Sequence, residues 1–358
     1  MQDQDFLQDA RTRLRTAVTA ANLPASIPLQ VSPWVAMSLL QKSIRRGQEG
    51  LALRAAATLL VVSPERLWRR CGGIAFEDVG LADLETVALV VAALAGKRFR
   101  ATLGGEWPVA SCIVSGLALA SKCRAADDLL MSAELHPAFA HTRQTLAGLS
   151  LPELLDLVTG VGRIEERAIA LWYAVGTMRR PSDHLQYRRG DAQAAFERLN
   201  TPSLAAINAV AQEGYRRTGE FLCPLLCLLH TVRQLETVAL SDDPLPPERM
   251  IGEVPGWCLD LYSREGRAAL EVFTRGTSRS ARWLRDHVPP YRRVECLGGV
   301  VFRVEGGVVR QRVCWPTSTR LREMVDYDSH GLGHDEAREL LDMMRDDIPL
   351  LNRVRADG

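Results

Sequence analysis

Hydrophobic residues recur at helical spacing along most of the first 240 residues of the chain. In the first such stretch, apolar residues from Phe6 to Val18 share one face, and polar residues occupy the opposite face. An apolar spacing of three to four residues is typical of amphipathic α-helices that pack against a core. The pattern predicts helices over 6–21, 34–46, 51–62, 64–79, 83–95, 109–120, 125–133, 152–161, 163–178, 192–199 and 204–236.

Capping residues mark the start of three of these helices. Ser32-Pro33 and Ser63-Pro64 each place a hydroxyl side chain directly before a proline, and Asp83 precedes an apolar run. A serine or aspartate at the N-cap accepts a hydrogen bond from the first turn, and proline is tolerated at the first helical position because its missing N–H would have no partner there. We therefore expect helices to begin at these three points.

The pattern changes after residue 240. The segment from Ser241 to Glu248 is rich in proline and acidic residues, as is typical of a linker. The mixed charge of 260–267 is typical of a functional or interfacial element, for which the sequence offers no mechanism. Two runs of alternating polarity flank Glu305-Gly306-Gly307, and they predict a β-hairpin over 293–315. Helices are expected around it, at 258–273, 319–325 and 334–348.

Composition and charge exclude several classes of protein. The 358 residues carry 44 lysines and arginines against 43 acids, a net charge of +1, so a wholly basic nucleic-acid coat is excluded although a local basic face is not. Acids stand at the N-terminus where a secretion signal needs basic residues, and no apolar run approaches the ~20 residues that span a bilayer. The eight cysteines form no C-x-x-C pair, which favours reduced thiols. We expect a soluble, cytoplasmic protein without membrane contact.

One region resembles a known family. Ser38-Leu-Leu-Gln-Lys-Ser-Ile-Arg-Arg-Gly47 is followed by an alanine-rich stretch and by Trp68-Arg-Arg-Cys-Gly-Gly-Ile-Ala-Phe-Glu-Asp-Val-Gly-Leu-Ala-Asp83, with a weaker echo at Gly116–Lys122. Together they are similar to the C-terminal region of the MgsA/RarA family of AAA+ ATPases, which are clamp-loader relatives that act at replication forks. The resemblance covers about residues 34–130. The matching residues are Leu40, Lys42, Ser43, Arg45, Arg69, Arg70, Ala75, Glu77, Asp78, Gly80, Ala82 and Asp83.

The resemblance implies a helical collar that holds subunits together, without the motor of the family. In the family the ATPase module precedes this region, whereas only 33 residues precede it here. The sequence contains no G-x-x-x-x-G-K-[ST] motif, so it has no P-loop to hold the phosphates of a nucleotide. We therefore expect no ATP hydrolysis and no cofactor, and the resemblance implies a scaffolding or oligomerising role.

The expected fold class is mainly α: a helical collar-like bundle followed by a small α+β C-terminal domain with one β-hairpin. No segment repeats at a fixed period, so a repeat architecture is not expected. We expect an N-terminal helix and linker at 1–30, a collar-like domain at 31–145, a further helical region at 146–240, a proline-rich linker at 241–256 and the α+β domain at 257–358.

Glu77 and Asp78 stand in the last turn of the helix predicted at 64–79. The helix dipole disfavours acids at that end by roughly 0.3–1 kcal/mol each, so we expect these acids to pair with cations. The candidate cations are Lys42, Arg45, Arg69 and Arg70. The alternative is a single basic patch that binds DNA phosphates or a partner. That patch would consist of Lys42, Arg45, Arg46, Arg69 and Arg70.

Other basic residues adjoin aromatic side chains. Lys97, Arg98 and Arg100 surround Phe99, and they could bind single-stranded nucleic acid or form a solvated loop. Arginine pairs recur in the sequence, and three of them adjoin a tyrosine. Such triplets could contact phosphates with stacking, or they could cover apolar neighbours at the surface. The pairs are Arg179-Arg180, Arg188-Arg189, Arg216-Arg217 and Arg292-Arg293, with Tyr187, Tyr215 and Tyr291 beside three of them.

The sequence contains two groups of potential metal ligands. Cys223, Cys227 and His230 share one helical face, but their neighbours are apolar and no fourth ligand is evident, which favours a buried stripe. The densest cluster of titratable side chains is Asp326, Asp328, His330 and His334. This cluster could bind a divalent metal for phosphodiester hydrolysis. Alternatively, its glycines place it in a loop at the entry of a helix.

These observations lead us to expect a non-catalytic accessory protein of DNA replication or repair that self-associates through the collar-like domain. Its partners would be a second copy of the chain and an AAA+ ATPase, a single-strand-binding protein, another replisome component or DNA. One alternative is a metal-dependent nuclease that uses the 326–335 cluster. The other is a mobile-element or regulatory protein that binds a host replication factor.

Overall fold

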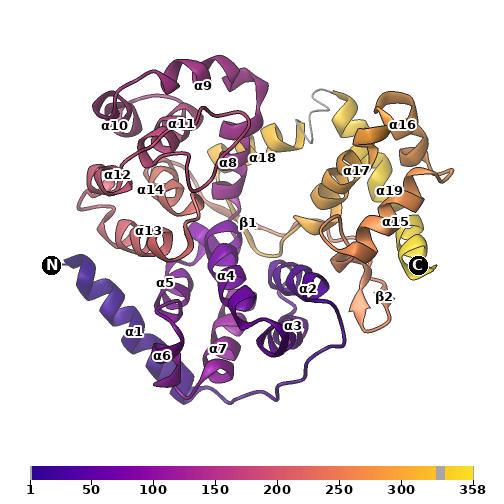
Figure 1. Ribbon diagram of the computed structural model, residues 1–358, viewed down its shortest axis with the longest axis horizontal. Helices are drawn as coiled ribbons and strands as arrows, with labels where there is room; N and C mark the ends of the chain where they lie inside the picture. The colour runs from indigo at the N-terminus through magenta and orange to yellow at the C-terminus, as the bar shows by residue number, and fades with distance from the viewer. Residues whose placement is uncertain (1, 328–334, 358) are drawn as a thin grey trace. The chain divides into compact units, whose positions relative to one another are not determined.

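The computed structural model describes residues 2–327 and 335–357, and in these residues it contains nineteen α-helices and two small two-stranded sheets (Figure 1). The fold is therefore mainly α, as predicted. The chain divides into two compact units, each assembled from three segments. Unit 1 comprises Met1–Leu23, Cys71–Ser241 and Arg312–Val325, and unit 2 comprises Pro24–Arg70, Asp242–Gln311 and Asp326–Gly358. The region 31–145, expected as one collar-like domain, contributes to both units.

Unit 1 is built around helix α11 (Ile164–Val175). Nearly every residue of α11 is buried, and the helix packs against α8, α9, α10, α12 and α14, which surround it in Figure 1. The remaining helices of the unit are α1 (Gln2–Ala20), α5 (Leu84–Ala93), α6 (Lys97–Ala101), α7 (Glu106–Leu119), α8 (Ala125–Leu135), α9 (Ala140–Ala147), α10 (Leu151–Thr159), α12 (Ala192–Leu199), α13 (Ala205–Thr218), α14 (Leu222–Arg233) and most of α18 (Pro316–Tyr327).

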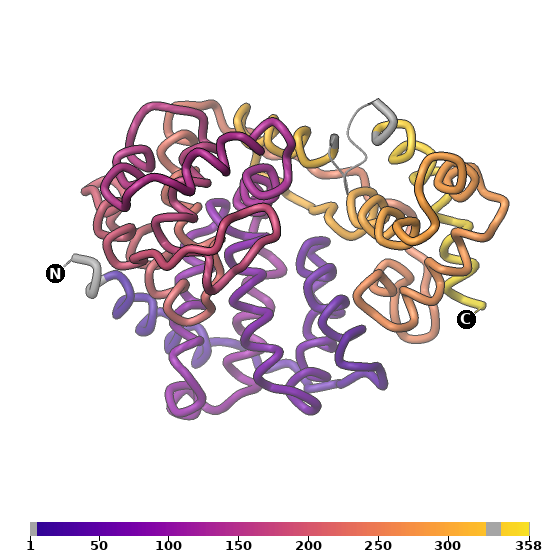
Figure 2. Tube along the Cα trace, turned by 45° about the horizontal axis from the view of Figure 1, so that its top comes forward, coloured from indigo at the N-terminus to yellow at the C-terminus, as the bar shows by residue number. Residues whose placement is uncertain are grey.

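Unit 2 contains two helical parts from distant stretches of the sequence. The first is the helix pair α2 (Pro33–Arg45) and α3 (Glu49–Val62), whose axes run beside each other (Figure 2). In the second, buried apolar residues such as Leu270, Leu284, Leu297 and Met344 form a common core. Its helices are α15 (Arg264–Thr274), α16 (Arg279–His287), α17 (Arg293–Val301) and α19 (Asp335–Asp357).

The β-hairpin predicted over 293–315 is wrong. Residues 293–301 form α17, and the π-helical turn Phe302–Gly306 continues it. The buried residues Leu297, Val300, Val301 and Val304 stand at positions i, i+3, i+4 and i+7. They therefore share one face of a helix and pack in the core. The following run supplies β4 (Arg312–Cys314), which pairs antiparallel with the distant strand β1 (Ala239–Ser241). A second small sheet joins β2 (Met250–Ile251) to β3 (Val254–Pro255).

Local sequence signals fix several helix ends. Ser32 Oγ accepts a hydrogen bond from the Val35 N–H at 3.3 Å, and Asp83 Oδ1 accepts one from the Thr86 N–H at 3.0 Å, so both predicted caps are confirmed. Helix α4 (Pro64–Ile74) follows Ser63 and ends in a π-helical turn, Ala75–Val79. The helix predicted at 204–236 is two helices, because Gly219 adopts a left-handed backbone conformation with φ of 74°.

The length and composition of the described helices bear on whether one of them could span a membrane. None of them combines the length and the apolar character that crossing a lipid bilayer requires. The longest, α19, is amphipathic: its sequence carries many charged residues, while Leu340, Met344 and Leu351 are buried. Its apolar face therefore belongs to the core of unit 2.

Candidate functional site

The conspicuous basic residues of the family-like segment lie in the interior of unit 2. Lys42, Arg45 and Arg46, at the C-terminal end of α2, are all buried. Ser38, Lys42 and Arg45 are spaced at four and three residues, so they share one face of the helix. Buried charges are costly unless they are paired and hydrogen-bonded. The partners of these side chains therefore define the chemistry of the site.

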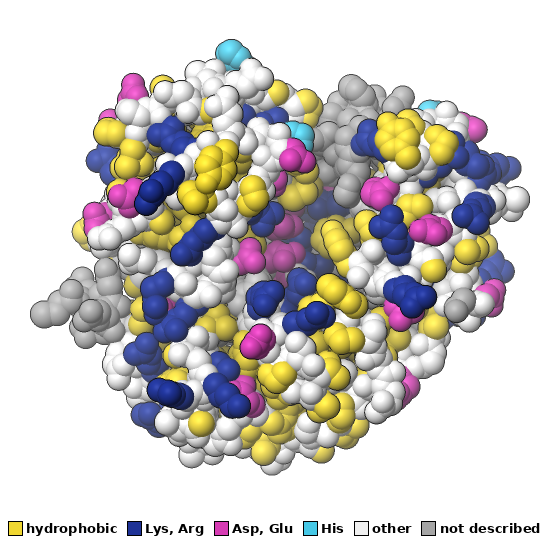
Figure 3. Space-filling model, viewed as in Figure 1, with side chains coloured by type: hydrophobic (Ala, Val, Ile, Leu, Met, Phe, Trp, Pro, Cys, Tyr) yellow, Lys and Arg dark blue, Asp and Glu magenta, His cyan; other side chains and the backbone are white. Residues whose placement is uncertain are grey.

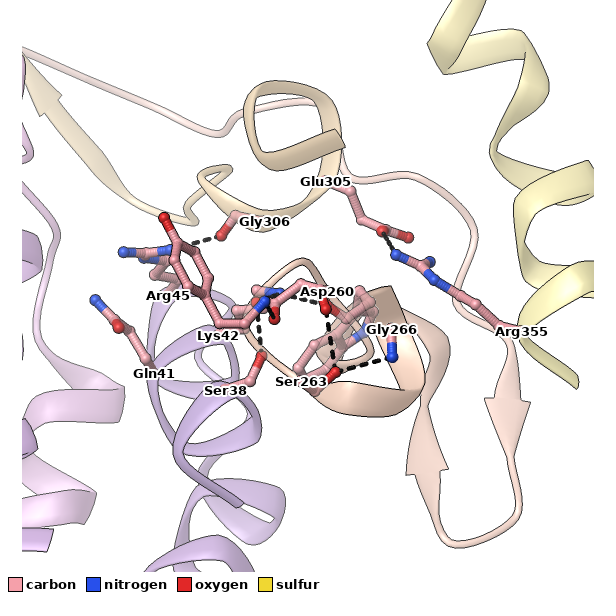
Figure 4. A network of polar contacts seen from close by, with 12 residues as sticks. Ser38, Gln41, Lys42, Arg45, Asp260, Ser263, Gly266, Glu305, Gly306 and Arg355 are labelled. Atoms are coloured by element: carbon pink, nitrogen blue, oxygen red, sulfur yellow. Dashed lines mark hydrogen bonds and ion pairs between the residues drawn. The ribbon is translucent and has the colours of Figure 1, made fainter. Parts of the chain in front are cut away.

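Lys42 and Asp260 form a buried ion pair. The ammonium Nζ lies 2.7 Å from Asp260 Oδ2 and also donates to the Trp257 carbonyl oxygen at 2.6 Å. Ser38 Oγ donates to the same carboxylate oxygen at 3.0 Å, and the Tyr262 N–H donates to Oδ1 at 2.9 Å. Figure 4 shows Ser38 and Lys42 of α2 pointing at this carboxylate. The pair thus joins α2 to the segment just before α15.

The loop that carries Asp260 is fixed by the N-cap of α15. Ser263 Oγ accepts a hydrogen bond from the Gly266 N–H and donates one to the Asp260 carbonyl oxygen, both at 3.1 Å (Figure 4). A Cβ at Gly266 would lie 2.1 Å from that carbonyl oxygen, so only glycine permits this close approach. The carboxylate is thereby presented to Lys42 by a rigid turn.

Burial and pairing act in opposite directions on the two partners. Burial lowers the pKa of Lys42, although the nearby Asp260 and Glu305 carboxylates partly oppose this. Burial alone would raise the pKa of Asp260, but the Lys42 ammonium outweighs it and the pKa is lowered. The carboxylate is therefore ionised at neutral pH and supplies a full negative charge beside the Lys42 ammonium.

Arg45 and Arg46 bond to backbone carbonyls. Arg45 donates to the Gly306 carbonyl oxygen, and Arg46 donates to the Glu305 carbonyl oxygen, each at 2.7 Å. The Arg46 guanidinium also lies 4.5 Å from the centroid of the Trp257 ring, as expected for a cation–π contact. Burial lowers the pKa of Arg46 to about 10, so the side chain remains charged at neutral pH.

Glu305 links the same turn to the C-terminal helix. Its carboxylate lies 2.9 Å from the Arg355 guanidinium of α19, and both side chains are almost fully buried (Figure 4). Arg355 also donates to Asn352 Oδ1 at 2.7 Å. The polar interior of unit 2 thus ties α2, the segment 257–263, the turn 305–306 and α19 together. Such a network of buried hydrogen bonds and ion pairs fixes how these elements pack.

A second buried cluster, in unit 1, contains Glu77 and Asp78. Both acids form ion pairs with Arg124, at 3.1 Å for Glu77, and Asp127 is a third carboxylate partner. Burial would lower the pKa of Arg124, but these three carboxylates and that of Asp128 outweigh it, and the pKa is raised. The predicted pairing of the two acids with cations is thus present, but the cation is Arg124, 46 residues from Asp78, and not one of the four basic residues predicted.

Lys122 lies close to this cluster in the sequence and is also buried. Its ammonium donates to the backbone carbonyl oxygens of Ala118, at 3.1 Å, and Ala120, at the C-terminal end of α7. Burial lowers the pKa of Lys122 to about 8, opposed by the charges of Asp78 and Asp83. The basic residue of the weaker family-like segment Gly116–Lys122 therefore also lies in the interior of its unit.

Four of the eight basic residues predicted to bind DNA or a partner are buried: Lys42, Arg45, Arg46 and Arg100. Arg100 pairs with Glu106 at 3.0 Å, while Arg70 donates to Gln41 Oε1 at the same distance. A buried guanidinium that already holds a protein group is not available to phosphate, so only Arg69 and Arg70 remain of the predicted five-residue patch. Lys97 and Arg98 are exposed. In Figure 3, basic side chains are spread over the face among acidic and apolar ones.

The two groups of potential metal ligands differ in what the structure shows of them. Cys223 and Cys227 are fully buried on α14, and burial raises the pKa of both thiols, so the predicted buried stripe is confirmed for the two cysteines, whereas His230 is half-buried. In the described part of the chain, no group of three or more His, Cys, Asp or Glu side chains is placed to hold a metal. Asp326 pairs with Arg303 in unit 2. Three of the four cluster residues lie outside the described residues: Asp328, His330 and His334.

Comparisons of the chain with models of protein families, with curated proteins and with solved structures found no match.

Proposed function

We propose that this chain is a non-catalytic accessory protein of DNA replication or repair, which self-associates through its helical region 31–145 and binds a replisome component or DNA. The link to replication rests on the resemblance of residues 34–130 to the C-terminal region of the MgsA/RarA family. In that family the region is a collar that holds subunits together, and this role needs no reaction centre.

The observation that carries the proposal is the burial of the polar residues in the family-like segment. Lys42 is paired with Asp260, and Asp78 is paired with Arg124, with all four side chains largely removed from solvent. A catalytic group must touch its substrate, whereas a buried ion pair can only orient the elements that carry it. These residues therefore support a structural role, as a non-catalytic protein requires.

Assembly also requires an exposed surface. Within 31–145, aliphatic side chains are exposed at the C-terminal ends of two helices: Val61 by 72% on α3 and Leu119 by 64% on α7. Isolated exposed aliphatic residues are common on protein surfaces, so they serve here as probe positions rather than as a defined interface. A charge introduced at a contact between copies would weaken it because the charge would lose water.

Light scattering after gel filtration tests self-association. We expect a mass above the 39.6 kDa of one chain, and a shift toward that value when Val61→Glu or Leu119→Glu is introduced. Val161→Glu is the matched control, because Val161 is fully exposed but lies outside 31–145. A mass of one chain at every concentration would contradict the self-association part of the proposal.

The replication part needs its own test. Isothermal titration calorimetry would measure binding of the purified chain to the single-strand-binding protein and to a clamp-loader-like AAA+ ATPase of the same cell. Binding to either protein supports the proposed role. If neither protein binds and DNA does not bind, the link to replication is lost, whatever the oligomeric state.

A further inference from the structure

Two of the arginine pairs noted in the sequence meet at one place in unit 1. Arg179-Arg180 follows α11, and Arg216-Arg217 forms the last turn of α13. They line an open hollow of about 520 Å³, together with Thr218, Gly219 and Glu220. Side chains that are 36 residues apart in the sequence are thus brought together by the fold.

Glycines at two helix ends place these pairs. Gly176 ends α11 with φ of 100°, and Gly219 ends α13 with φ of 74°, both in the region that side-chain-bearing residues rarely adopt. The loop after Gly176 is held by a hydrogen bond of 3.0 Å from the Thr177 N–H to the Arg188 carbonyl oxygen. The backbone that leads to the first arginine pair is therefore fixed. The second pair lies at the C-terminal end of α13, where the negative end of the helix dipole favours cations.

Arg179 is the cation least compensated by protein charges. Its guanidinium donates to the Tyr215 carbonyl oxygen at 3.3 Å and lies 4.9 Å from the centroid of the Tyr215 ring. In the described residues it has no carboxylate partner. A guanidinium that is held in place but retains free N–H donors is suited to accept an anionic oxygen pair.

The other three arginines are only partly neutralised. Arg216 bonds to both Glu213 oxygens at 2.6 Å, and Arg217 bonds to one of them at 2.8 Å, so two cations share one carboxylate. Arg180 lies 3.8 Å from Glu220 and 3.9 Å from Glu134, which is too long for good hydrogen bonds. The hollow is therefore lined by four cations and one acid, Glu220.

The hollow offers charge rather than an aromatic surface. Tyr215 is only 7% exposed, and its ring packs against Phe196 at 5.8 Å between centroids and beneath Arg179. A nucleobase has no access to this ring, so the stacking part of the hypothesis for this triplet is not supported. Recognition by these residues would depend on phosphate oxygens, which bind guanidinium groups in a bidentate manner.

We propose that this hollow binds phosphate groups, carried either by the backbone of single-stranded nucleic acid or by a free nucleotide. The inference deepens the proposed function and rests on it only for naming nucleic acid as one source. Because no base is read, binding is insensitive to sequence. Because the contacts are charge pairs, binding weakens steeply as the salt concentration rises.

Two probes distinguish the sources. Fluorescence anisotropy measures the binding of a labelled oligothymidylate of about 20 nucleotides, and calorimetry measures the binding of ATP. The test variant is Arg179→Gln combined with Arg216→Gln, for which we expect affinity to fall by about tenfold or more. The matched control is Arg198→Gln, since Arg198 is exposed in the same unit and pairs with Asp156 at 2.8 Å, much as Arg216 pairs with Glu213.

If the double variant loses oligothymidylate binding and Arg198→Gln keeps it, the hollow is a nucleic-acid site. If the double variant loses ATP binding and Arg198→Gln keeps it, the hollow is a nucleotide site. The proposal is overturned if neither probe binds the unmodified chain, or if Arg198→Gln weakens binding as much as the double variant does. Light scattering on the same samples reports self-association independently. Failure of the phosphate site is thereby distinguished from failure of the proposed function.

Discussion

Two of the three lysines in the chain are buried, one in each unit, and their surroundings differ. Lys42, in unit 2, lies 2.7 Å from the Asp260 carboxylate, which Ser38 and the Tyr262 N–H also hold. Lys122, in unit 1, donates to the backbone carbonyl oxygens of the last turn of α7. The first is an ion pair between distant segments, whereas the second is a lysine that caps a helix C-terminus.

The difference shows what a carboxylate in direct contact contributes that carbonyl oxygens do not. The carbonyl oxygens at a helix C-terminus carry only about half an elementary charge in total. Burial lowers the pKa of Lys122 to about 8, although the charges of Asp78 and Asp83 oppose this, so the ammonium is held at considerable cost. Burial lowers the pKa of Lys42 as well, but the Asp260 carboxylate contacts its ammonium directly and has its own pKa lowered in return. We infer that the Lys42 pair specifies how its elements pack, while Lys122 is tolerated.

The largest effect is expected from removing the carboxylate. Asp260→Ala leaves Lys42 buried without its counter-charge, so we expect the free energy of unfolding to fall by about 3–5 kcal/mol. Urea unfolding followed by circular dichroism at pH 7 measures this change. Arg54→Gln is the control in the same unit, because the exposed Arg54–Glu253 pair should contribute less than about 1 kcal/mol. Equal losses in the two variants would refute a special role for the buried pair.

The same pair has a defined response to acid. Because the pKa of Asp260 is lower in the folded chain than in the unfolded chain, its contribution is complete above the ordinary carboxyl pKa of about 4. It is lost as the pH falls through the lower folded value. The stability difference between the unmodified chain and Asp260→Ala should therefore shrink only below about pH 4.

A smaller loss is expected in the cluster of unit 1. Asp78→Ala removes one of the three carboxylates that form ion pairs with Arg124, and Glu77 and Asp127 remain to hold the guanidinium. We therefore expect a loss of about 2 kcal/mol in unfolding free energy, less than for Asp260→Ala. Thermal and urea unfolding would detect it, together with the mass from light scattering. Unchanged stability and unchanged assembly would show that this ion pair has no structural role.

The smallest effect has the opposite sign. Lys122→Met removes a costly buried charge but also its bonds to two carbonyl oxygens, so we expect a gain of about 1–2 kcal/mol at pH 7. Between the folded pKa of about 8 and the unfolded value near 10.4, the unfolded chain binds more protons. The unmodified chain therefore gains stability as the pH rises through this window, and the advantage of Lys122→Met should decline. An advantage that grows with pH would be inconsistent with a buried, charged Lys122.

The sequence predicts what local physics controls. The caps at Ser32 and Asp83 are confirmed because the hydrogen bonds they make reach only three residues ahead. The hairpin over 293–315 is wrong because its apolar residues fit a helix as well as a strand, and only core packing decides between them. The buried pairs link residues 46 positions apart, for Asp78 and Arg124, and 218 apart, for Lys42 and Asp260. No spacing rule reaches across such separations.

Some signals for the missed partners were nevertheless present. The mixed charge of 260–267 stands out in the sequence, and its first residue is the partner of Lys42. Arg124 and Asp127 are three residues apart, the spacing at which side chains on a helix face meet. The sequence does not show, however, which acid is the partner of a given basic residue.

The interleaved order of the segments matters while the chain is being synthesised. The last segment of unit 1, Arg312–Val325, leaves the ribosome only after most of unit 2, so β1 waits for β4 throughout that interval. Helix α19 then completes unit 2 last of all. Both nascent cores remain incomplete, with apolar residues exposed, until these segments have been synthesised, which makes the emerging chain a natural client for chaperones. For the same reason, a premature stop codon anywhere before these final segments would damage both units at once.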